Sequence, residues 1–511
     1  MKSHCCSRSI AVAVAIAGLT LLLDAAVATA ATQRAAPDRQ TVSIHLEIQS
    51  RSELALLTRL VSIDDVRGTE VRASATPEQL EALRLAGYGW RVVSEAEKAD
   101  GIVMCPPGWV ENTDRSWTCY PTYDQYTALM QHFAFNHPDL CHLVDLGPTN
   151  SVVLPHRLWA VVVSDNPGDE EDEPEVLLTS TIHGDETTGF VLMLRLIDRL
   201  VAGYGDDDEI TSLVNNTEIW INPLANPDGT YRGGDHTVAD AIRNYTTTTG
   251  ANSGVDGNRN FPDFEDGDHP DGRSWWPETL AMMALAEGET FVLSANFHDG
   301  IEVVNYPWDT VERRHPDDKW FEALARNWAD LAQSDSPGGY MTDRDNGVTN
   351  GYDWYEVHGG RQDFMTFFHG AREVTVELSK TTLLPAEDLD DYWQWNRRAM
   401  LDFIAHAHRG IRGTVTDRNG NPLAATVEVV GIDRAEDGST VRTDPAVGDF
   451  HRLLLPGLYD LRIEAPGYVS VEFYGVAVSE GEATIVDVVL YRNQVRRSGR
   501  RISPILSKGP R

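Results

Sequence analysis

Basic residues are scarce in this chain. Its 511 residues include 43 Lys and Arg against 78 Asp and Glu, which gives a formal net charge of −35 at pH 7. This excess of negative charge argues against nucleic acids and anionic membrane surfaces as partners. It favours either cationic ligands or solubility alone, and solubility is the simpler explanation.

Long apolar runs are absent after the first 31 residues. No later run reaches the roughly 20 residues needed to span a bilayer, so we expect no stable membrane insertion. Residues 1–31 combine Lys2 and Arg8 with the apolar stretch Ile10–Leu23 and a small-residue end, AAVATAA. This pattern is typical of a cleaved secretory signal peptide. We therefore expect a soluble protein that is secreted or periplasmic.

Cysteine is also rare, with five residues in the chain. Cys5 and Cys6 precede the apolar N-terminal stretch and do not make a lipoprotein cleavage site. Export permits disulfides, and Cys105 and Cys119, which bracket a loop rich in Pro, Gly and Trp, are the expected pair. Closing a loop of that length contributes roughly 3 kcal/mol of stability. Cys141 is then unpaired, and we expect it to be buried.

The length predicts two to four domains, because one core does not grow to this size. Strand-like and helical patterns predict a small α/β module at 33–100, which we expect to be a propeptide, an intramolecular chaperone or a permanent domain. Apolar strands alternate with helices over 101–409, which predicts a mixed, largely parallel sheet with helices on both faces. Short strands separated by turns over 410–492 predict a small β-sandwich. The basic stretch 493–511 is expected to be disordered.

The elements of the 101–409 segment follow from the spacing of apolar residues. Helices are predicted at Tyr123–Asn136, Thr187–Val201, Pro277–Glu287, Asp317–Gln333 and Pro385–Ala407, and strands at Leu158–Val163, Val176–Ile182, Glu218–Asn222, Phe291–Phe297, Val303–Tyr306 and Arg372–Leu378. The acidic runs at 169–173 and 206–209 are predicted to be solvated loops.

The apolar run Val176–Ile182 leads directly into His183-Gly-Asp-Glu186. The run predicts a buried strand, and ligands of open α/β sheets bind beyond the C-terminal ends of the strands. A neutral imidazole and a carboxylate are two of the roughly three protein ligands that a hydrolytic zinc site needs. Alone, such a pair is more often an ordinary pair on a helix surface.

Further polar residues fall at or near the ends of predicted strands. His298 ends the strand FVLSANF, and Glu377 stands in an otherwise apolar strand, where a carboxylate is costly unless it is paired or functional. Arg243 and Arg259 are cations suited to an oxyanion and to a bidentate carboxylate clamp. Each residue also has an ordinary structural explanation, such as a core histidine, a strand-edge ion pair or a surface charge. Their joint placement favours a catalytic site.

The motifs resemble those of the zinc carboxypeptidase family, in particular the regulatory branch that includes carboxypeptidases E, N and D. The resemblance covers roughly 120–492 and rests on H-G-D-E, Asn226-Pro-Asp-Gly229, Gly254-Val-Asp-Gly-Asn-Arg-Asn-Phe261, Ser294-Ala-Asn-Phe-His298, Thr349–Tyr355, Gly359–Asp363 and Val376–Ser379. It implies a zinc carboxypeptidase-like α/β domain at 101–409, followed by a transthyretin-like sandwich at 410–492.

The resemblance also implies one Zn²⁺ per chain. His183, Glu186 and His298 would bind the ion and leave a water at the fourth position. Glu377 would take the proton of this water and later deliver it to the leaving amine.

The remaining roles are implied in the same way. Arg243, fifteen residues before Asn258, would stabilise the tetrahedral oxyanion. Asn258 and Arg259 would bind the terminal carboxylate of the substrate, and Tyr355 would close over the bound residue.

The resemblance places two further residues at the side chain being removed. Asp309 lies eleven residues after His298, and Gln362 lies seven residues after Tyr355. An acidic pocket favours Lys or Arg, and the less favoured alternative is that Asp309 is a surface residue. The expected protein is therefore a secreted zinc metallocarboxypeptidase that acts on peptide or protein C-termini ending in Lys or Arg.

Two alternatives stay open. The same metal site could act on neutral C-terminal residues or cell-wall peptides, or the fold could be an inactive binding or adhesion module. A serine hydrolase and an H-E-x-x-H metalloprotease are disfavoured, because neither G-x-S-x-G nor H-E-x-x-H occurs. In the enzymatic interpretation, we expect the 33–100 module to cover the cleft before maturation.

Overall fold

The computed structural model describes residues 41–93, 101–149, 156–244 and 255–493. The predicted signal peptide at 1–31 and the predicted basic tail, apart from Asn493, lie outside the described residues. Both ends of the predicted 33–100 module do so as well.

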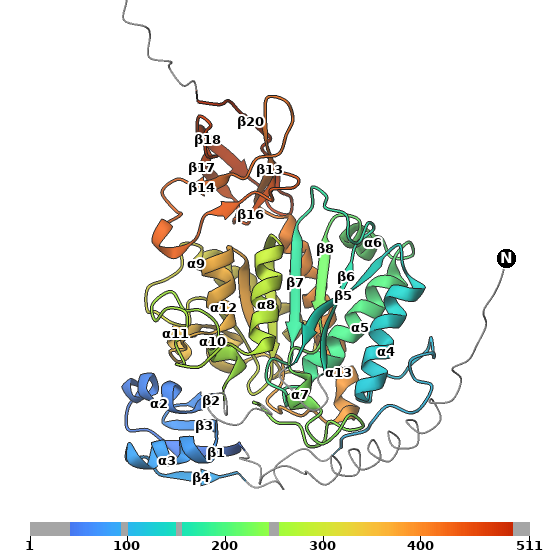
Figure 1. The fold of residues 1–511 in the computed structure, drawn as a ribbon, viewed down its shortest axis with the longest axis vertical. Helices are drawn as coiled ribbons and strands as arrows, with labels where there is room; N and C mark the ends of the chain where they lie inside the picture. The colour runs from blue at the N-terminus through green and yellow to red at the C-terminus, as the bar shows by residue number, and fades with distance from the viewer. Residues whose placement is uncertain (1–40, 94–100, 150–155, 245–254, 494–511) are drawn as a thin grey trace, which may run out of the picture. The chain divides into compact units, whose positions relative to one another are not determined.

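An eight-stranded sheet forms the centre of the 101–409 segment (Figure 1). Its strands are β5 (Cys141–Pro148), β6 (Arg157–Val163), β7 (Glu175–Ser180), β8 (Glu218–Asn222), β9 (Phe291–His298), β10 (Val303–Tyr306), β11 (Val348–Asn350) and β12 (Arg372–Glu377). Their order is β11-β10-β12-β9-β7-β8-β6-β5. Strands β12, β9, β7 and β8 run parallel, whereas β10 is antiparallel to β12 and β6 is antiparallel to β8 and β5. The predicted mixed sheet is confirmed.

Helices cover both faces of this sheet. The longer ones are α4 (Tyr123–Asn136), α5 (Thr188–Gly203), α8 (Pro277–Gly288), α9 (Asp318–Asp335) and α13 (Leu389–Ala405). Along β7, Val176 and Leu178 pack in one core with α4, α5, α9 and α13, whereas Leu177 packs in another core with α8. Successive side chains of a strand point to opposite faces, so both faces of β7 are buried. This explains why β7 is a continuous apolar run.

The prediction of a solvated loop at 206–209 is wrong. Asp207 caps helix α6 (Asp208–Val214), because its Oδ1 accepts hydrogen bonds from the backbone N–H groups of Glu209 and Ile210. Carboxylates in the first helical turn are favoured by the helix dipole. The charge run was therefore the start of a helix. The run at 169–173 is a loop, as predicted.

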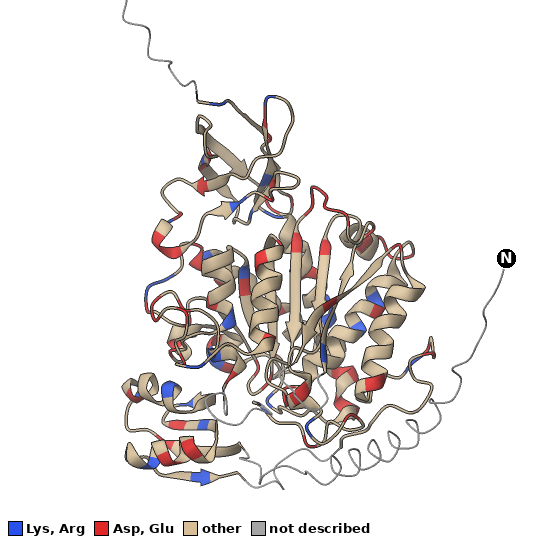
Figure 2. Ribbon diagram, in the orientation of Figure 1, with Lys and Arg blue, Asp and Glu red and all other residues tan. Residues whose placement is uncertain are grey.

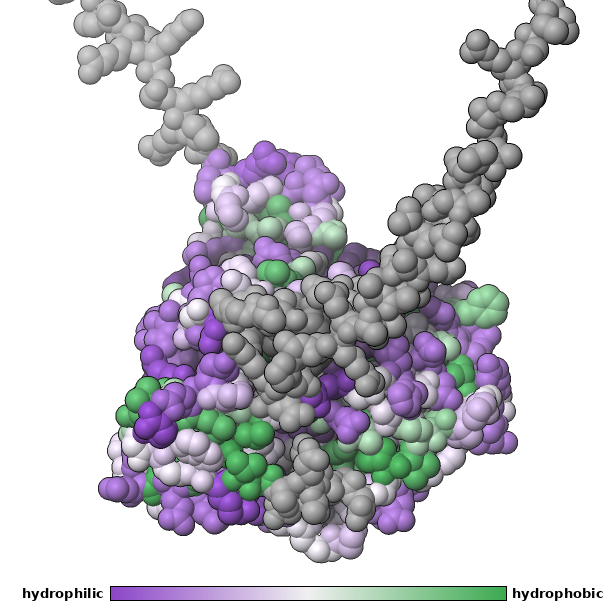
Figure 3. Space-filling view, turned by 60° about the horizontal axis from the view of Figure 1, so that its bottom comes forward, coloured by the Kyte–Doolittle hydropathy of each residue, from purple (hydrophilic) through white to green (hydrophobic). Residues whose placement is uncertain are grey.

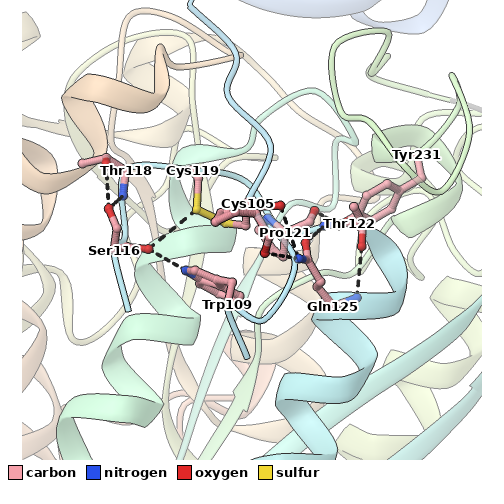
Figure 4. Close-up of a disulfide and its surroundings, with 10 residues drawn as sticks. Cys105, Trp109, Ser116, Thr118, Cys119, Pro121, Thr122, Gln125 and Tyr231 are labelled. Atoms are coloured by element: carbon pink, nitrogen blue, oxygen red, sulfur yellow. Dashed lines mark hydrogen bonds between the residues drawn. A yellow bond between two sulfur atoms is a disulfide. The ribbon is translucent and has the colours of Figure 1, made fainter. Parts of the chain in front are cut away.

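The predicted disulfide is present between Cys105 and Cys119 (Figure 4). The enclosed loop buries Trp109 and Trp117, and the Arg115 guanidinium lies 5.8 Å and 5.6 Å from their ring centres. Arg115 also forms an ion pair with Asp198 of α5. The loop is thereby attached to the helix layer. Cys141 is unpaired and buried, as predicted.

Residues 41–93 form an antiparallel sheet with two helices. The elements are β1 (Val42–Glu47), α2 (Leu54–Leu60), β2 (Ser62–Arg67), β3 (Glu70–Ala75), α3 (Pro77–Leu85) and β4 (Trp90–Val92), and the strand order is β2-β3-β1-β4. The sequence patterns do not predict β2 and β3. The core of this module, which includes Ile63, continues into Ile301, Val303 and Trp354 of the central domain. The module therefore packs against that domain.

Two four-stranded sheets form a β-sandwich after residue 410, which confirms the predicted sandwich. Its strands are β13 (Ile411–Asp417), β14 (Thr426–Val429), β15 (Val441–Arg442), β16 (Asp449–Arg452), β17 (Gly457–Glu464), β18 (Val471–Val478), β19 (Thr484–Ile485) and β20 (Val488–Leu490). Inward-facing residues such as Val415, Val427 and Leu461 form its core.

Charged residues are unevenly distributed over the ribbon. Acidic residues gather where β7 and β8 begin and in the loop that leads into β7 (Figure 2). On the face shown in Figure 3, hydrophobic residues form separate patches within a mainly hydrophilic surface. Within the described ranges, no helix is both long enough and apolar enough to cross a bilayer.

Candidate metal centre and active site

Three buried side chains converge at the C-terminal ends of β7 and β9. His183 follows β7, Glu186 comes three residues later, and His298 ends β9. The two imidazole Nδ1 atoms lie 3.1 Å apart, and the Glu186 carboxylate oxygens lie 2.9 Å from His183 Nδ1 and 2.7 Å from His298 Nδ1. Donors bound tetrahedrally to zinc at about 2.0–2.2 Å lie roughly 3.3 Å apart. The three donors therefore fit one zinc ion.

The outer nitrogens of both imidazoles have partners. His183 Nε2 lies 3.0 Å from Asp256 Oδ1, and His298 Nε2 lies 2.9 Å from the side-chain amide of Asn296. Such partners fix the ring orientation and direct the other nitrogen to the metal. The sequence analysis missed both residues, although each had a signal. Asp256 lies in the G-x-D-x-N-R-N motif, and Asn296 shares a face of β9 with His298.

The Asn-Pro-Asp-Gly turn supports the loop that carries His183. Asn226 Nδ2 donates to the carbonyl oxygen of Ile182 at 3.1 Å, and Thr230 Oγ1 donates to that of Gly184 at 2.6 Å. A Cβ on Gly184 would lie 2.5 Å from the backbone of Gly229. The close approach of the two loops therefore requires glycine at position 184.

Glu377 ends β12, where it is in parallel register with His298. It is buried, and its Oε2 has no hydrogen-bond partner in the described part of the chain. Burial, and then the negative charge of Glu186, raise the pKa of Glu377 well above its ordinary value. A buried carboxylate with an unpaired oxygen beside the donors can exchange a proton with a small molecule bound there.

Arg243 contacts the metal donor Glu186 directly. Its guanidinium is buried and donates from Nη1 to Glu186 Oε1 at 2.5 Å. It also donates from Nε to Ser62 Oγ at 2.7 Å, and the same Nε lies 3.2 Å from Asp64 Oδ1. Ser62 and Asp64 belong to β2 of the N-terminal module.

Asp256 connects the metal donors to Asn258 and Arg259. Its Oδ1, which lies near His183, also accepts from the backbone N–H of Asn258 at 2.8 Å. Arg259 Nη2 donates to the hydroxyl of Tyr355 at 3.4 Å, while its Nε has no partner among the described residues. Burial raises the pKa of Tyr355 to about 12, so its hydroxyl stays protonated at neutral pH.

Asp309 and Gln362 are in contact. Asp309 Oδ1 accepts from Gln362 Nε2 at 3.0 Å and from Asn305 Nδ2 at 2.9 Å. Asp309 is 6% exposed, and burial raises its pKa to about 6. A Cβ on Gly351 would lie 1.6 Å from Asp309 Oδ1, so the segment before Tyr355 packs directly on this carboxylate. The structure thus brings all the predicted site residues into one region.

The start of β2 also reaches this region. Ser62 Oγ contacts Arg243 and donates to Asp256 Oδ2, and Asp64 pairs with Arg243. The carbonyl oxygen of Ile63 accepts from the Tyr355 hydroxyl at 3.4 Å. The sequence analysis predicts a cover over the cleft but names none of these residues.

Two imidazoles and a carboxylate at the strand ends, beside a buried glutamate, are typical of zinc-dependent hydrolases. The family model "Zinc carboxypeptidase" matches residues 126–399, and the model "Carboxypeptidase regulatory-like domain" matches residues 410–491. The chain belongs to the zinc carboxypeptidase family. One zinc ion per chain is its cofactor, and His183, Glu186 and His298 are the residues that would hold it.

The chain is similar in sequence to several carboxypeptidases. The chain is 34% identical to carboxypeptidase M of Mus musculus over 67% of its own length and 77% of that protein. It is 34% identical to the carboxypeptidase N catalytic chain of Homo sapiens over 76% of its length and 89% of that protein. The match to carboxypeptidase D of Anas platyrhynchos, 37% identical over 68% of this chain, spans 25% of that longer protein.

Solved structures share the fold. Carboxypeptidase A from Helicoverpa armigera matches with a TM-score of 0.55 and 18% identity, over 71% of this chain and 96% of that one. Thrombin activatable fibrinolysis inhibitor matches with a TM-score of 0.53 and 16% identity, over 72% and 99%. At these identities, the likeness concerns the fold alone.

Proposed function

We propose that this chain is an exported zinc metallocarboxypeptidase that hydrolyses the C-terminal peptide bond and releases Lys or Arg. The observation that carries the basic preference is the buried carboxylate of Asp309. Two amides hold it, and no Lys or Arg of the described chain forms an ion pair with it. A buried anion without a counter-ion favours a cationic side chain.

The positions of the side chains support the proposed catalytic roles. When bound, zinc supplies Lewis-acid activation of water and carbonyl groups. Glu377 accepts a proton from the attacking water and delivers it to the leaving amine. Arg243, whose guanidinium reaches the donor Glu186, stabilises the oxyanion of the tetrahedral intermediate.

Recognition of a free C-terminus rests on Asn258 and Arg259. The unpartnered Nε–H of Arg259 and the side chain of Asn258 bind the terminal carboxylate, which restricts the enzyme to the last residue. Tyr355, whose hydroxyl accepts a hydrogen bond from Arg259, covers the residue being removed.

The activity is tested with a dansylated dipeptide ending in Arg. We expect hydrolysis that a chelator abolishes and added zinc restores. In Glu377→Gln, kcat should fall by about 10²–10⁴-fold while the zinc content stays unchanged. No turnover of any basic or neutral C-terminal substrate by zinc-loaded protein would contradict the proposal and favour an inactive binding or adhesion module.

The specificity is tested separately with Asp309→Asn on peptides ending in Arg and in Phe. The preference for Arg should fall by at least about tenfold. Asp345→Asn is a matched control, because that carboxylate is 85% exposed. An unchanged preference in Asp309→Asn would contradict the proposal that Asp309 selects basic residues. It would favour neutral C-terminal residues or cell-wall peptides as substrates.

We further propose that the 33–100 module is inhibitory until maturation. Substrate and module compete for the same groups, because Asp64 pairs with Arg243 and the carbonyl of Ile63 accepts from Tyr355. Five core residues of the central domain pack in the apolar core of the module: Ile301, Val303, Trp354, Tyr355 and Val357. A substrate therefore has to displace β2.

A specific protease site introduced between residues 93 and 101 tests this proposal. Cleavage should raise kcat/KM, and Asp64→Ala should raise the activity of the uncleaved chain severalfold. Glu47→Ala, an exposed carboxylate of β1, is the control and should have no effect. An equal kcat/KM before cleavage and after cleavage and removal of the module would contradict this proposal.

A further inference from the structure

A second group of metal-ligating side chains lies where the β-sandwich meets the central domain, away from the zinc donors. Asp172 belongs to the loop that precedes β7, and Asp449 and His451 belong to β16 of the sandwich. Each offers one ligand atom, and these atoms all lie within 4.8 Å of one another. The two parts of the chain therefore meet at a His-Asp-Asp cluster.

His451 is the most informative member of this cluster. It is 6% exposed, and among the described residues its imidazole forms one hydrogen bond, from Nε2 to Asp449 Oδ2 at 2.9 Å. The Nδ1 atom is buried and has no hydrogen-bond partner among the described residues. Outside the cluster, this imidazole thus has no partner at all in the described chain. A buried imidazole with no other role is a suitable metal ligand.

The surrounding charge favours a cation. Glu170, Glu175 and Asp444 form a second carboxylate group within 4.8 Å at the same junction. No Lys or Arg of the described ranges forms an ion pair with any carboxylate of the two groups. Arg412 donates to the backbone oxygen of Asp172 at 3.5 Å and forms no ion pair with its carboxylate. Uncompensated carboxylates that are partly buried are costly.

We propose that Asp172, Asp449 and His451 bind a second divalent metal ion of the zinc class, which joins the β-sandwich to the central domain. One imidazole and two carboxylates suit zinc better than calcium, which takes oxygen ligands. Asp449 is buried, whereas Asp172 is exposed, so the open side of the site admits water as a further ligand. The site is structural, because it lies apart from Glu377 and Arg243.

Metal analysis of the full chain, equilibrated with micromolar zinc and freed of excess metal, tests the proposal. Wild type should retain two zinc ions per chain, and His451→Gln and Asp172→Asn should each retain one. His298→Gln should lose the catalytic ion and keep the second. One zinc ion in wild type, or two in His451→Gln, would overturn the proposal.

Thermal unfolding provides an independent readout. Zinc added to protein that already holds the catalytic ion should raise the Tm of wild type but not that of Asp172→Asn, whose exposed side chain is dispensable for folding. Asp206→Asn, another exposed carboxylate, should respond as wild type does. A rise with calcium but not with zinc would overturn the assigned metal class. Since His451→Gln should keep its peptidase activity, failure of this proposal is distinguishable from failure of the catalytic one.

Discussion

Two glutamates of this site, Glu186 and Glu377, differ in pKa because their surroundings differ. Glu186 lies between two imidazoles and Arg243. Burial alone would raise its pKa, but these neighbours hold the pKa well below the ordinary value. Glu377 has no such partners, and burial raises its pKa. Two glutamates in one region thus serve different purposes, one as a permanent anion and the other as a group that can carry a proton.

Asp256 should control zinc affinity. In Asp256→Asn the carboxylate that orients His183 is lost, so we expect zinc affinity to fall by about 10–100-fold. Competition with a chromogenic chelator measures this change. Asp268→Asn, an exposed residue of the same loop region, is the control. Equal affinity in both variants would show that the contact between Asp256 and His183 does not orient the ligand.

Asp309 should make substrate preference depend on pH. Burial raises its pKa to about 6, so the free enzyme loses the negative charge as the pH falls through this value. The ratio of kcat/KM for Arg-ended over Phe-ended substrates should therefore fall below about pH 6 and level off above it. Asp309→Asn should remove the pH dependence of the ratio. A wild-type ratio that is constant from about pH 5 to pH 8 would contradict this prediction.

At the scale of elements, the ends of parallel strands and one disulfide-closed loop position the site. His298 and Glu377 share register on the parallel strands β9 and β12, so hydrogen bonding between the strands sets their spacing. The segment 105–119 packs onto α5 through Arg115 and Asp198. Helix α5 begins two residues after the metal donor Glu186, so the 105–119 loop supports the helix that follows this donor.

Removal of the disulfide should lower stability. The Cys105→Ser, Cys119→Ser double variant should lose roughly 3 kcal/mol, because the bond closes a loop between two cysteines 14 positions apart. Chemical denaturation measures the loss. Cys141→Ala is the control for a single buried thiol, and a double variant as stable as wild type would show that the side-chain packing alone holds the loop.

For the chain as a unit, buried ion pairs link the sandwich to the central domain. Arg452 of β16 is fully buried and donates to Asp317 at 2.6 Å and to Asp433 at 2.7 Å. Arg372 of β12 donates to the other oxygen of Asp317 at 2.8 Å. Because each charge has a partner, the burial is tolerated.

Arg452→Ala should destabilise the chain by about 3–5 kcal/mol, because it leaves buried carboxylates without their cation. Calorimetry should show a lower Tm. Arg462→Ala removes a surface arginine from ion pairs with Glu428 and Glu472 and should change the Tm little, because solvent screens such pairs. Similar losses in the two variants would contradict a role of the buried network in joining the domains.

Much of the central fold can be predicted from local patterns. The predicted strands Glu218–Asn222 and Val303–Tyr306 agree with β8 and β10 residue for residue, because both are apolar runs buried on both faces. Strand β2, with the sequence SIDDVR, is missed because its adjacent charged residues interrupt the alternation of apolar and polar residues that indicates a strand. The edge strand β5 is missed for a related reason, since all of its residues except Cys141 are partly buried or exposed.

The sequence alone allowed the metal donors His183, Glu186 and His298 to be predicted, together with Glu377, Arg243 and Arg259 as candidate site residues, because these residues stand in motifs of specific residue types and spacings. The tertiary structure alone decided which distant groups meet them. Ser62 contacts Arg243 across 181 positions of chain, and Asp172 meets Asp449 and His451 from another domain. Such contacts depend on how separate hydrophobic cores pack against one another, and local sequence patterns do not predict that packing.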